Sequence, residues 1–111
     1  MDCLFCKIVI GSIPAEIVKK SDRVTAFKDI SPQAPIHVLV IPNQHFENMA
    51  KVAEFDLALV GEIFDMASSV AREFGIDSYR TNTNTGESAG QSVFHAHLHL
   101  LGGRTFAWPP G

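Results

Sequence analysis

The chain has 111 residues and a formal net charge of −3, so its length fits one domain and its charge gives no reason to expect a nucleic-acid partner. Hydrophobic residues make up 46% of the sequence, which is enough for a packed core and excludes a disordered chain. No apolar run reaches the roughly 18 residues of a membrane span, and no signal peptide is recognisable. We therefore expect a single domain over residues 1–111, a cytoplasmic location and no membrane partner.

The first half of the chain predicts a short helix followed by strands. The apolar segment 3–9 ends near Gly11, which indicates a short helix or a turn. Three strands are expected next, over residues 16–20, 24–29 and 36–41. The last of these is nearly all apolar, so we expect a central strand with both faces covered. Pro32 and Pro35 precede it and predict a loop.

The second half predicts one long helix between strands. Over residues 54–74, apolar side chains recur at helical spacing, and Gly75 is a suitable residue to follow the helix. A strand rich in Thr and Tyr is expected at 79–84, a loop at 85–90 and a final strand at 91–101. Short connections between strands favour an antiparallel sheet with the helix on one face, which is an α+β fold.

Histidines alternate with small or apolar residues in the final strand. They are His95, His97 and His99, separated by Ala96 and Leu98 and followed by Leu100. Successive side chains of a strand point to opposite faces, so the imidazoles share one face and the apolar residues the other. His95 and His99 would stand roughly 13 Å apart at about 3.3 Å per residue, too far for one metal ion with bonds of about 2.1 Å. The spacing favours a central histidine as nucleophile or proton carrier, with flanking groups that orient it.

Motifs along nearly the whole chain resemble the histidine triad (HIT) superfamily. The run His-Ala-His-Leu-His-Leu-Leu at 95–101 is similar to its His-φ-His-φ-His-φ-φ signature, with Ala96 as a small residue at the first φ position. Further matches lie at residues 27–32, 37–42, 90–92 and 101–104. The ending Trp-Pro-Pro-Gly at 108–111 resembles the Hint branch, the histidine triad nucleotide-binding proteins. The resemblance implies a five-stranded antiparallel sheet with one long helix and a short N-terminal helix, in a homodimer.

The activity implied by this resemblance is hydrolysis of the P–N bond in purine nucleoside 5′-phosphoramidates, such as AMP joined to an amine. His97 resembles the nucleophile that forms a nucleotidyl-imidazole intermediate, and His37 resembles an orienting group beside it. Ser92 resembles the residue beside the leaving group, and His99 resembles a phosphate contact. The other nucleotide-binding positions are Phe5, Ile8, Phe27 and Ile30 at the base, Asp29 at the ribose, Asn84, Gly90 and Gln91 at the phosphate, and Trp108 in a tail that reaches the partner's site. No organic cofactor is implied.

The chemistry of these residue types suits the same roles. Attack by a histidine divides a difficult P–N cleavage into two steps, and the departing amine then needs a proton. Side-chain and backbone donors stabilise negative charge on phosphate oxygens, and an ionised carboxylate such as Asp29 accepts hydrogen bonds from a ribose diol. Structural alternatives stay open: a turn cap for Asp29, an ordinary turn residue for Asn84, plain core for Phe27 and Ile30, a tail anchor for Trp108 and a hydrogen-bonded core histidine for His37.

The pair Cys3 and Cys6 has C-x-x-C spacing, which without an export signal favours metal or redox chemistry over a structural disulfide. Two cysteines and two histidines make a tetrahedral zinc set. In the resemblance, His45 and His95 match the positions that bind structural zinc in HIT proteins with an N-terminal C-x-x-C. The alternatives are buried free thiols or a redox pair, although a thioredoxin-like pair requires a βαβ context that the predicted elements lack.

Competing functions come from the same superfamily and from a different class. The first alternatives are a HIT dinucleoside polyphosphate hydrolase of the Fhit branch and a nucleotidyl transferase. The tail at 108–111 argues against Fhit, and His99 argues against the transferases, which carry Gln in that place. Another alternative is a non-catalytic nucleotide-binding regulatory or scaffold protein. A nucleoside triphosphatase is disfavoured because no P-loop lysine motif is present.

Overall fold

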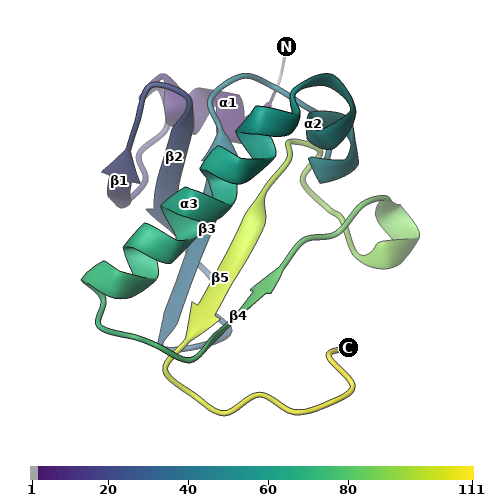
Figure 1. Cartoon of the computed structure of the whole chain (residues 1–111). Helices are drawn as coiled ribbons and strands as arrows, with labels where there is room; N and C mark the ends of the chain where they lie inside the picture. The colour runs from purple at the N-terminus through teal and green to yellow at the C-terminus, as the bar shows by residue number, and fades with distance from the viewer. Residues whose placement is uncertain (1–2) are drawn as a thin grey trace.

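The computed structural model describes residues 3–111, which form a five-stranded antiparallel sheet with helices on both faces (Figure 1). The first two residues of the expected domain span lie outside the described part. The elements are α1 Leu4–Val9, β1 Ile17–Lys20, β2 Val24–Lys28, β3 Ile36–Pro42, α2 Met49–Phe55, α3 Leu57–Glu73, β4 Tyr79–Asn82, the 3-10 helix η1 Glu87–Ala89 and β5 Leu98–Gly102. The strands lie in the order β1-β2-β3-β5-β4. The predicted α+β fold is confirmed, and none of the described helices has the length and apolar character needed to cross a membrane.

The central strand β3 contributes to two separate cores, as its apolar sequence predicts. Val38 and Val40 pack into the larger core beneath α2 and α3, and this core also contains the buried side of β5. Leu39 and Ile41 point the other way, into a smaller core formed with α1. Figure 1 shows α3 in front of the sheet and α1 behind it. Because alternate residues of a strand serve opposite faces, the sheet has one face covered by α2 and α3 and a second face that α1 partly covers.

The single helix expected at 54–74 is wrong at its N-terminal end. The chain forms α2, breaks at Asp56 and continues as α3. Asp56 has φ −153° and ψ 78°, and its carboxylate accepts a hydrogen bond from the backbone N–H of Leu59 at 3.2 Å, which makes it the N-cap of α3. The apolar periodicity runs across this break, so spacing alone did not reveal it.

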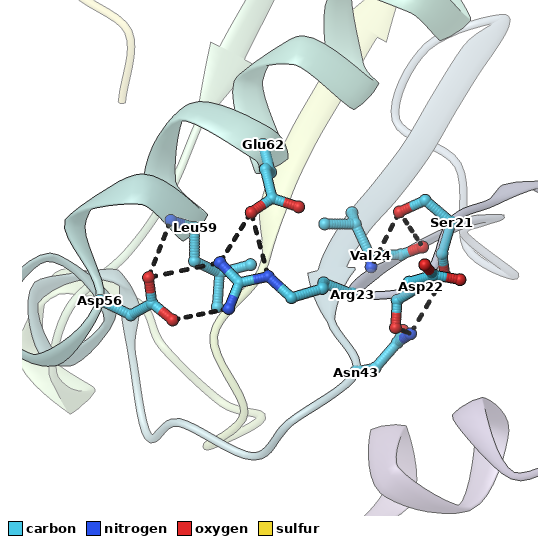
Figure 2. A network of polar contacts seen from close by, with 8 residues as sticks. All are labelled: Ser21, Asp22, Arg23, Val24, Asn43, Asp56, Leu59 and Glu62. Carbon is cyan, nitrogen blue, oxygen red and sulfur yellow. Dashed lines mark hydrogen bonds and ion pairs between the residues drawn. The ribbon is translucent and has the colours of Figure 1, made fainter.

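A charged network fixes the position of this break (Figure 2). Arg23 follows the β1–β2 turn, and its guanidinium contacts Asp56 at 2.8 Å and Glu62 of α3 at 2.7 Å. These hydrogen bonds from Arg23 hold the pKa of Asp56 below its ordinary value. The planar guanidinium fork can hold two carboxylates at once, so the hairpin, the α2–α3 junction and α3 are joined at one point.

The helix α2, which sequence patterning missed, yields a stability prediction. Asn48 is its N-cap and accepts a hydrogen bond from the N–H of Lys51 at 2.9 Å. Replacing Asn48 with Ala is expected to lower the unfolding free energy by about 1 kcal/mol, as measured by urea unfolding, because the first turn loses its acceptor. Asn48→Asp keeps an acceptor and is expected to stay close to wild type. Equal losses in both variants would contradict the capping role.

Candidate functional site

The histidine segment has the predicted sidedness, although its strand is shorter than expected. Ala96, Leu98 and Leu100 are buried in the larger core, on the α3 side of the sheet. The predicted strand at 91–101 is wrong in extent, because β5 begins only at Leu98.

The cause of this shorter strand lies at the end of its neighbour β3. The last β3–β5 pair joins Val40 to Leu98, and Pro42 has no N–H to continue the ladder. The N–H of Ala96 instead donates to the carbonyl of Phe46 at 2.7 Å. The backbone just before β5 therefore hydrogen bonds to the loop after β3 and not to β3 itself. The strand expected at 79–84 is also shorter, as β4 ends at Asn82.

His97 is held with one ring nitrogen free for chemistry. Its Nδ1 lies 2.7 Å from the carbonyl oxygen of His95, and this oxygen can only accept. In the neutral ring, Nδ1 therefore carries the hydrogen and Nε2 keeps a lone pair, as a nucleophile requires. The ring packs edge-on against Phe5 at 5.3 Å and against His99 at 5.0 Å between centroids. The hydroxyl of Thr83 donates to the carbonyl of His97 at 2.8 Å and fixes the backbone from the other side.

His37 and His99 form a hydrogen-bonded chain that begins at the backbone of Gln33. The N–H of Gln33 donates to Nδ1 of His37 at 3.0 Å, so the hydrogen of a neutral His37 ring resides on Nε2. This Nε2 lies 2.9 Å from Nδ1 of His99 and donates to it. His99 then carries its own hydrogen on Nε2, ready to donate to a ligand. We call the Gln33 N–H, His37 and His99 the histidine relay.

Burial keeps both relay histidines neutral near pH 7. Desolvation is the main cause that lowers the pKa of His99 to about 4, and neighbouring His97 and His37 add to it, while Asp29 opposes it. Desolvation also lowers the pKa of His37, again opposed by Asp29, whose Oδ2 lies 3.5 Å from His37 Nε2. A neutral relay keeps one defined direction of hydrogen bonding, because each neutral imidazole has one donor and one acceptor.

The lowered pKa of His99 predicts acid sensitivity. Below its ordinary pKa of 6.5 the unfolded state takes up a proton that the folded state refuses until about pH 4. The unfolding free energy is therefore expected to fall as the pH drops through this window, by up to about 1.4 kcal/mol per pH unit for this one proton. Urea unfolding at about pH 7 and about pH 5, with chelator throughout, should show a shallower decline for His99→Gln. Equal declines would contradict the assignment.

A second cluster joins the N-terminal helix to the histidine segment. Nδ1 of His95 lies 3.4 Å from Sγ of Cys3, 3.5 Å from Sγ of Cys6 and 3.2 Å from Nδ1 of His45. Sγ of Cys6 lies 3.5 Å from Nδ1 of His45. Bonds of about 2.3 Å to sulfur and about 2.0–2.1 Å to nitrogen at tetrahedral angles imply S···N separations of about 3.6 Å and an N···N separation of about 3.3 Å. The donor atoms therefore have the spacing of a closed four-ligand zinc site.

The protonation pattern of His95 also fits a metal ligand. Its Nε2 donates to the carbonyl of Pro42 at 2.8 Å, which leaves a lone pair on Nδ1 directed at the cluster. One in-plane lone pair cannot make separate hydrogen bonds to Cys3, Cys6 and His45, whereas a shared cation satisfies all these contacts. Burial and the neighbouring Cys3 raise the pKa of Cys6.

Asp29, His37 and His99 also place three ligand atoms within 4.8 Å of one another, but their hydrogen bonding disfavours a metal. Nε2 of His37 carries the hydrogen because the N–H of Gln33 occupies the other ring nitrogen. A nitrogen that carries hydrogen has no lone pair for a metal, and the 2.9 Å contact to His99 is a hydrogen bond. The two histidine groups thus have different chemistry: a cluster that could hold a metal at one end and a hydrogen-bonded relay at the other.

An apolar pocket of about 250 Å³ lies beside α1, and its lining includes Asp29, which contacts His37 of the relay. Its lining comprises Leu4, Phe5, Ile8, Ile13, Pro14, Ala15, Phe27, Lys28, Asp29, Ile30, Leu39 and Val93. Five of these residues were predicted from the sequence, namely Phe5, Ile8, Phe27, Asp29 and Ile30. The segment 13–15 was missed, although its apolar residues after Gly11 could have indicated a contribution to the pocket. Phe27 is buried and serves both core and pocket. Ile30 is 99% exposed at the rim, so the plain-core alternative is wrong for it.

Asp29 caps a turn, which is the structural alternative predicted for it, and it also lines this pocket. Its Oδ1 accepts from the N–H of Ser31 at 2.8 Å, which caps the turn. Oδ2 makes only the longer contact to His37. One carboxylate oxygen therefore remains oriented towards the relay and the pocket rim.

The loop before the histidine segment is braced by Gln91. Its buried side chain accepts from the N–H of Gly86 at 2.8 Å and donates to the carbonyl of Glu47 at 2.7 Å. Gln91 therefore supports the loop with its amide. Asn84 lies next to Gly90, where an added Cβ would approach Asn84 Nδ2 to 3.4 Å.

The remaining predicted site residues lie apart from the apolar pocket. Ser92 is exposed in the loop that leads to the histidines. Trp108 is 84% exposed on the C-terminal tail, which runs beyond β4 on the opposite side of Figure 1 from α1. The pocket lining includes neither residue. Sequence patterning had no signal for Gln33, which acts through its backbone, or for Thr83, an ordinary strand-end threonine.

Comparisons with known proteins agree with this fold. The family model of the HIT domain matches residues 11–106. An uncharacterized HIT-like protein of Synechococcus elongatus is 46% identical over 99% of this chain and 97% of its own length. A 14 kDa zinc-binding protein of Zea mays is 43% identical over 97% of this chain and 87% of its own. The structure of a HIT family hydrolase from Legionella pneumophila superimposes with a TM-score of 0.95 and 45% identity, covering 99% of this chain and 100% of that one. With its fold, its histidine segment and these relatives in agreement, the chain belongs to the HIT domain family.

Proposed function

We propose that this protein is a HIT hydrolase that cleaves the P–N bond of purine nucleoside 5′-phosphoramidates through a nucleotidyl intermediate on His97. The observation that carries the proposal is the hydrogen bond from His97 Nδ1–H to the His95 carbonyl, which leaves an unshared lone pair on Nε2. The name of the Legionella relative, a HIT family hydrolase, supports hydrolysis in general. Membership of the Hint branch, and with it the phosphoramidate substrate, rests on the motif resemblance.

The first step would be attack of His97 Nε2 on the phosphorus atom. A P–N(His) bond forms, the P–N bond to the amine breaks, and the amine leaves with a proton from Ser92 or a water that it positions. The positive charge that builds up on the imidazole is stabilised by the His95 carbonyl facing Nδ1–H, 2.7 Å away. His99 Nε2–H would donate to a phosphate oxygen, together with Asn84 and backbone N–H groups near Gly90.

The second step would be attack of water on the same phosphorus atom. The P–N(His97) bond breaks, a nucleoside monophosphate is released, and the proton of the attacking water returns to Ser92 or the water that it positions, while His97 keeps its hydrogen on Nδ1 throughout. The apolar pocket with Phe5 and Phe27 would hold the purine, since aromatic edges and faces suit a flat heterocycle. Asp29 Oδ2 at the rim would accept from the ribose hydroxyls.

We also propose zinc as a structural metal bound by Cys3, Cys6, His45 and His95. The tetrahedral spacing of the four donors supports this choice, as does the zinc-binding name of the Zea mays relative. Bound there, zinc would supply a crosslink between α1 and the histidine segment. Two properties stay predictions: the cytoplasmic location, and a homodimer, for which the outer strand β4 offers an unpaired edge.

Steady-state kinetics on a panel of nucleotides tests the proposed function. We expect AMP linked to an alkylamine to be hydrolysed to AMP and amine, and a dinucleoside polyphosphate to react far more slowly. Preference for the dinucleotide would favour the Fhit-type activity. Binding of AMP without any cleavage would contradict the hydrolase and favour a nucleotide-binding regulatory protein.

A further inference from the structure

Arg104 lies outside the apolar pocket, yet it holds the residue from which the histidine relay begins. Its Nε donates to the carbonyl of Gln33 at 2.9 Å. The N–H of the same Gln33 donates to Nδ1 of His37 at 3.0 Å. The Gln33 side chain donates to the carbonyl of Ser31 at 3.0 Å. Gln33 is therefore anchored at its side chain and its carbonyl, and these anchors aim its N–H at the relay.

The sheet register brings these two parts of the chain together. Ile36 at the start of β3 pairs with Gly102 at the end of β5. The loop before β3 and the segment after β5 therefore lie at the same edge of the sheet. Gly103 has φ +88°, and a Cβ there would meet the Pro35 Cβ at 2.9 Å, so the close approach of the two segments requires glycine.

Arg104 is itself held in place by the C-terminal tail. Its guanidinium carbon lies 4.2 Å from the ring centroid of Phe106, and that of Arg80 lies 5.0 Å from the same centroid. Arg80 also donates to the carbonyl of Ala107 at 2.8 Å, and Arg104 donates to that of Thr105 at 3.0 Å. Cation–π contacts are strongest for a planar guanidinium on a ring, so this arrangement favours one orientation of Arg104.

We propose that Arg104 is a positioning residue for catalysis: by holding Gln33, it fixes the tautomers of His37 and His99 so that His99 presents an N–H to the substrate. Without the Gln33 donor, Nδ1 of His37 is free to carry the ring hydrogen, and Nε2 becomes an acceptor. His99 would then donate from Nδ1 to His37 and turn a lone pair towards the phosphate oxygens. The effect on substrate rests on the proposed phosphoramidase function, whereas the tautomer effect does not.

Nitrogen NMR of the ligand-free protein tests the tautomers directly. Long-range ¹H–¹⁵N spectra distinguish protonated from unprotonated imidazole nitrogens, so wild type should show His37 and His99 both as Nε2–H tautomers. We expect Arg104→Met to give a mixture in both rings. Arg104→Lys restores a donor near the Gln33 carbonyl and is expected to recover part of the wild-type pattern. Arg72→Met, a change of an exposed arginine on α3, is the matched control and should leave the spectra unchanged.

A second variant removes the donor itself and guards against a merely structural effect. Gln33→Pro deletes the backbone N–H and is expected to switch the tautomers fully, while Gln33→Ala keeps the N–H and the Arg104 anchor, loses only the side-chain anchor, and should retain most of the wild-type pattern. With AMP–alkylamine, kcat of Arg104→Met is expected to fall about tenfold with little change in KM, because a misplacement of about 1 Å in a reacting site can cost up to about 100-fold in rate. Wild-type tautomers in Arg104→Met would overturn the proposal, and wild-type tautomers in Gln33→Pro would show that the Gln33 N–H does not set them. Failure of the wild type to cleave any phosphoramidate would overturn only the proposed function, and the spectra would still decide the role of Arg104.

Discussion

Replacing His97 with Ala is expected to lower kcat/KM for AMP–alkylamine by about 10⁴-fold or more, because the proposed covalent intermediate forms on His97. The ring of His97 is the one whose Nδ1 is fixed by a backbone carbonyl beside the apolar pocket. His99→Gln keeps an N–H donor but moves it from its position in the imidazole ring. Its kcat/KM should therefore fall less, by about 10²-fold, as expected when one phosphate contact is weakened. Steady-state rates measured side by side give both values.

Rapid-quench mass spectrometry checks that the two losses have different origins. Wild type should carry a nucleotide adduct during turnover, and His97→Ala should carry none. Ser69→Ala, on the exposed side of α3, is a suitable control for handling and folding and should match wild type. Equal turnover by wild type and His97→Ala would remove His97 from the mechanism.

Removal of the metal is expected to destabilise the fold as well as the pocket. Zinc bound only by the folded state contributes roughly 4 kcal/mol when free zinc exceeds its Kd by about 1,000-fold. We therefore expect chelation of the wild type to lower the unfolding free energy by about this amount. The cluster joins α1 to His45 and His95, and α1 also carries Phe5 and Ile8 of the pocket. A rise in KM for the nucleotide should accompany the loss of stability.

Cys6→Ser provides the matched control for this experiment. The variant should be less stable than wild type without chelator, and chelator should not change it further. Native mass spectrometry should find one zinc per wild-type chain and none in the variant. A zinc-free wild type whose stability and KM do not respond to chelator would contradict the metal site.

Side-chain alternation made the faces of the histidine segment predictable from sequence. An extended backbone sends alternate residues to opposite sides whether or not it is paired, so Ala96 and Leu98 were correctly placed in the core. The start of the strand was not predictable, because it depends on the N–H of Ala96 meeting the Phe46 carbonyl and on Pro42 ending the neighbouring strand. Local pattern fixes sidedness, whereas pairing depends on distant partners.

The break at Asp56 illustrates the same limit. An acidic residue in an apolar periodic run fits the polar face of one long helix as well as it fits an N-cap. Arg23, which lies far away in the sequence, contacts Asp56 and Glu62 and so stabilises the N-cap arrangement. The reactive side chains of the proposed site were named from motif positions and stay predictions, but Gln33 contributes its backbone N–H, and no side-chain pattern can reveal such a contribution.

The double-sided burial of β3 has a consequence for how this protein can change in length. Val38 and Val40 belong to one core, Leu39 and Ile41 to the other, and His37 stands on the relay side. Insertion or deletion of a single residue would exchange the two sets and turn His37 towards α3. Over evolution, gains and losses of residues are therefore expected in the connection at 74–78 rather than within β3, because the chain can lengthen there without reversing either core.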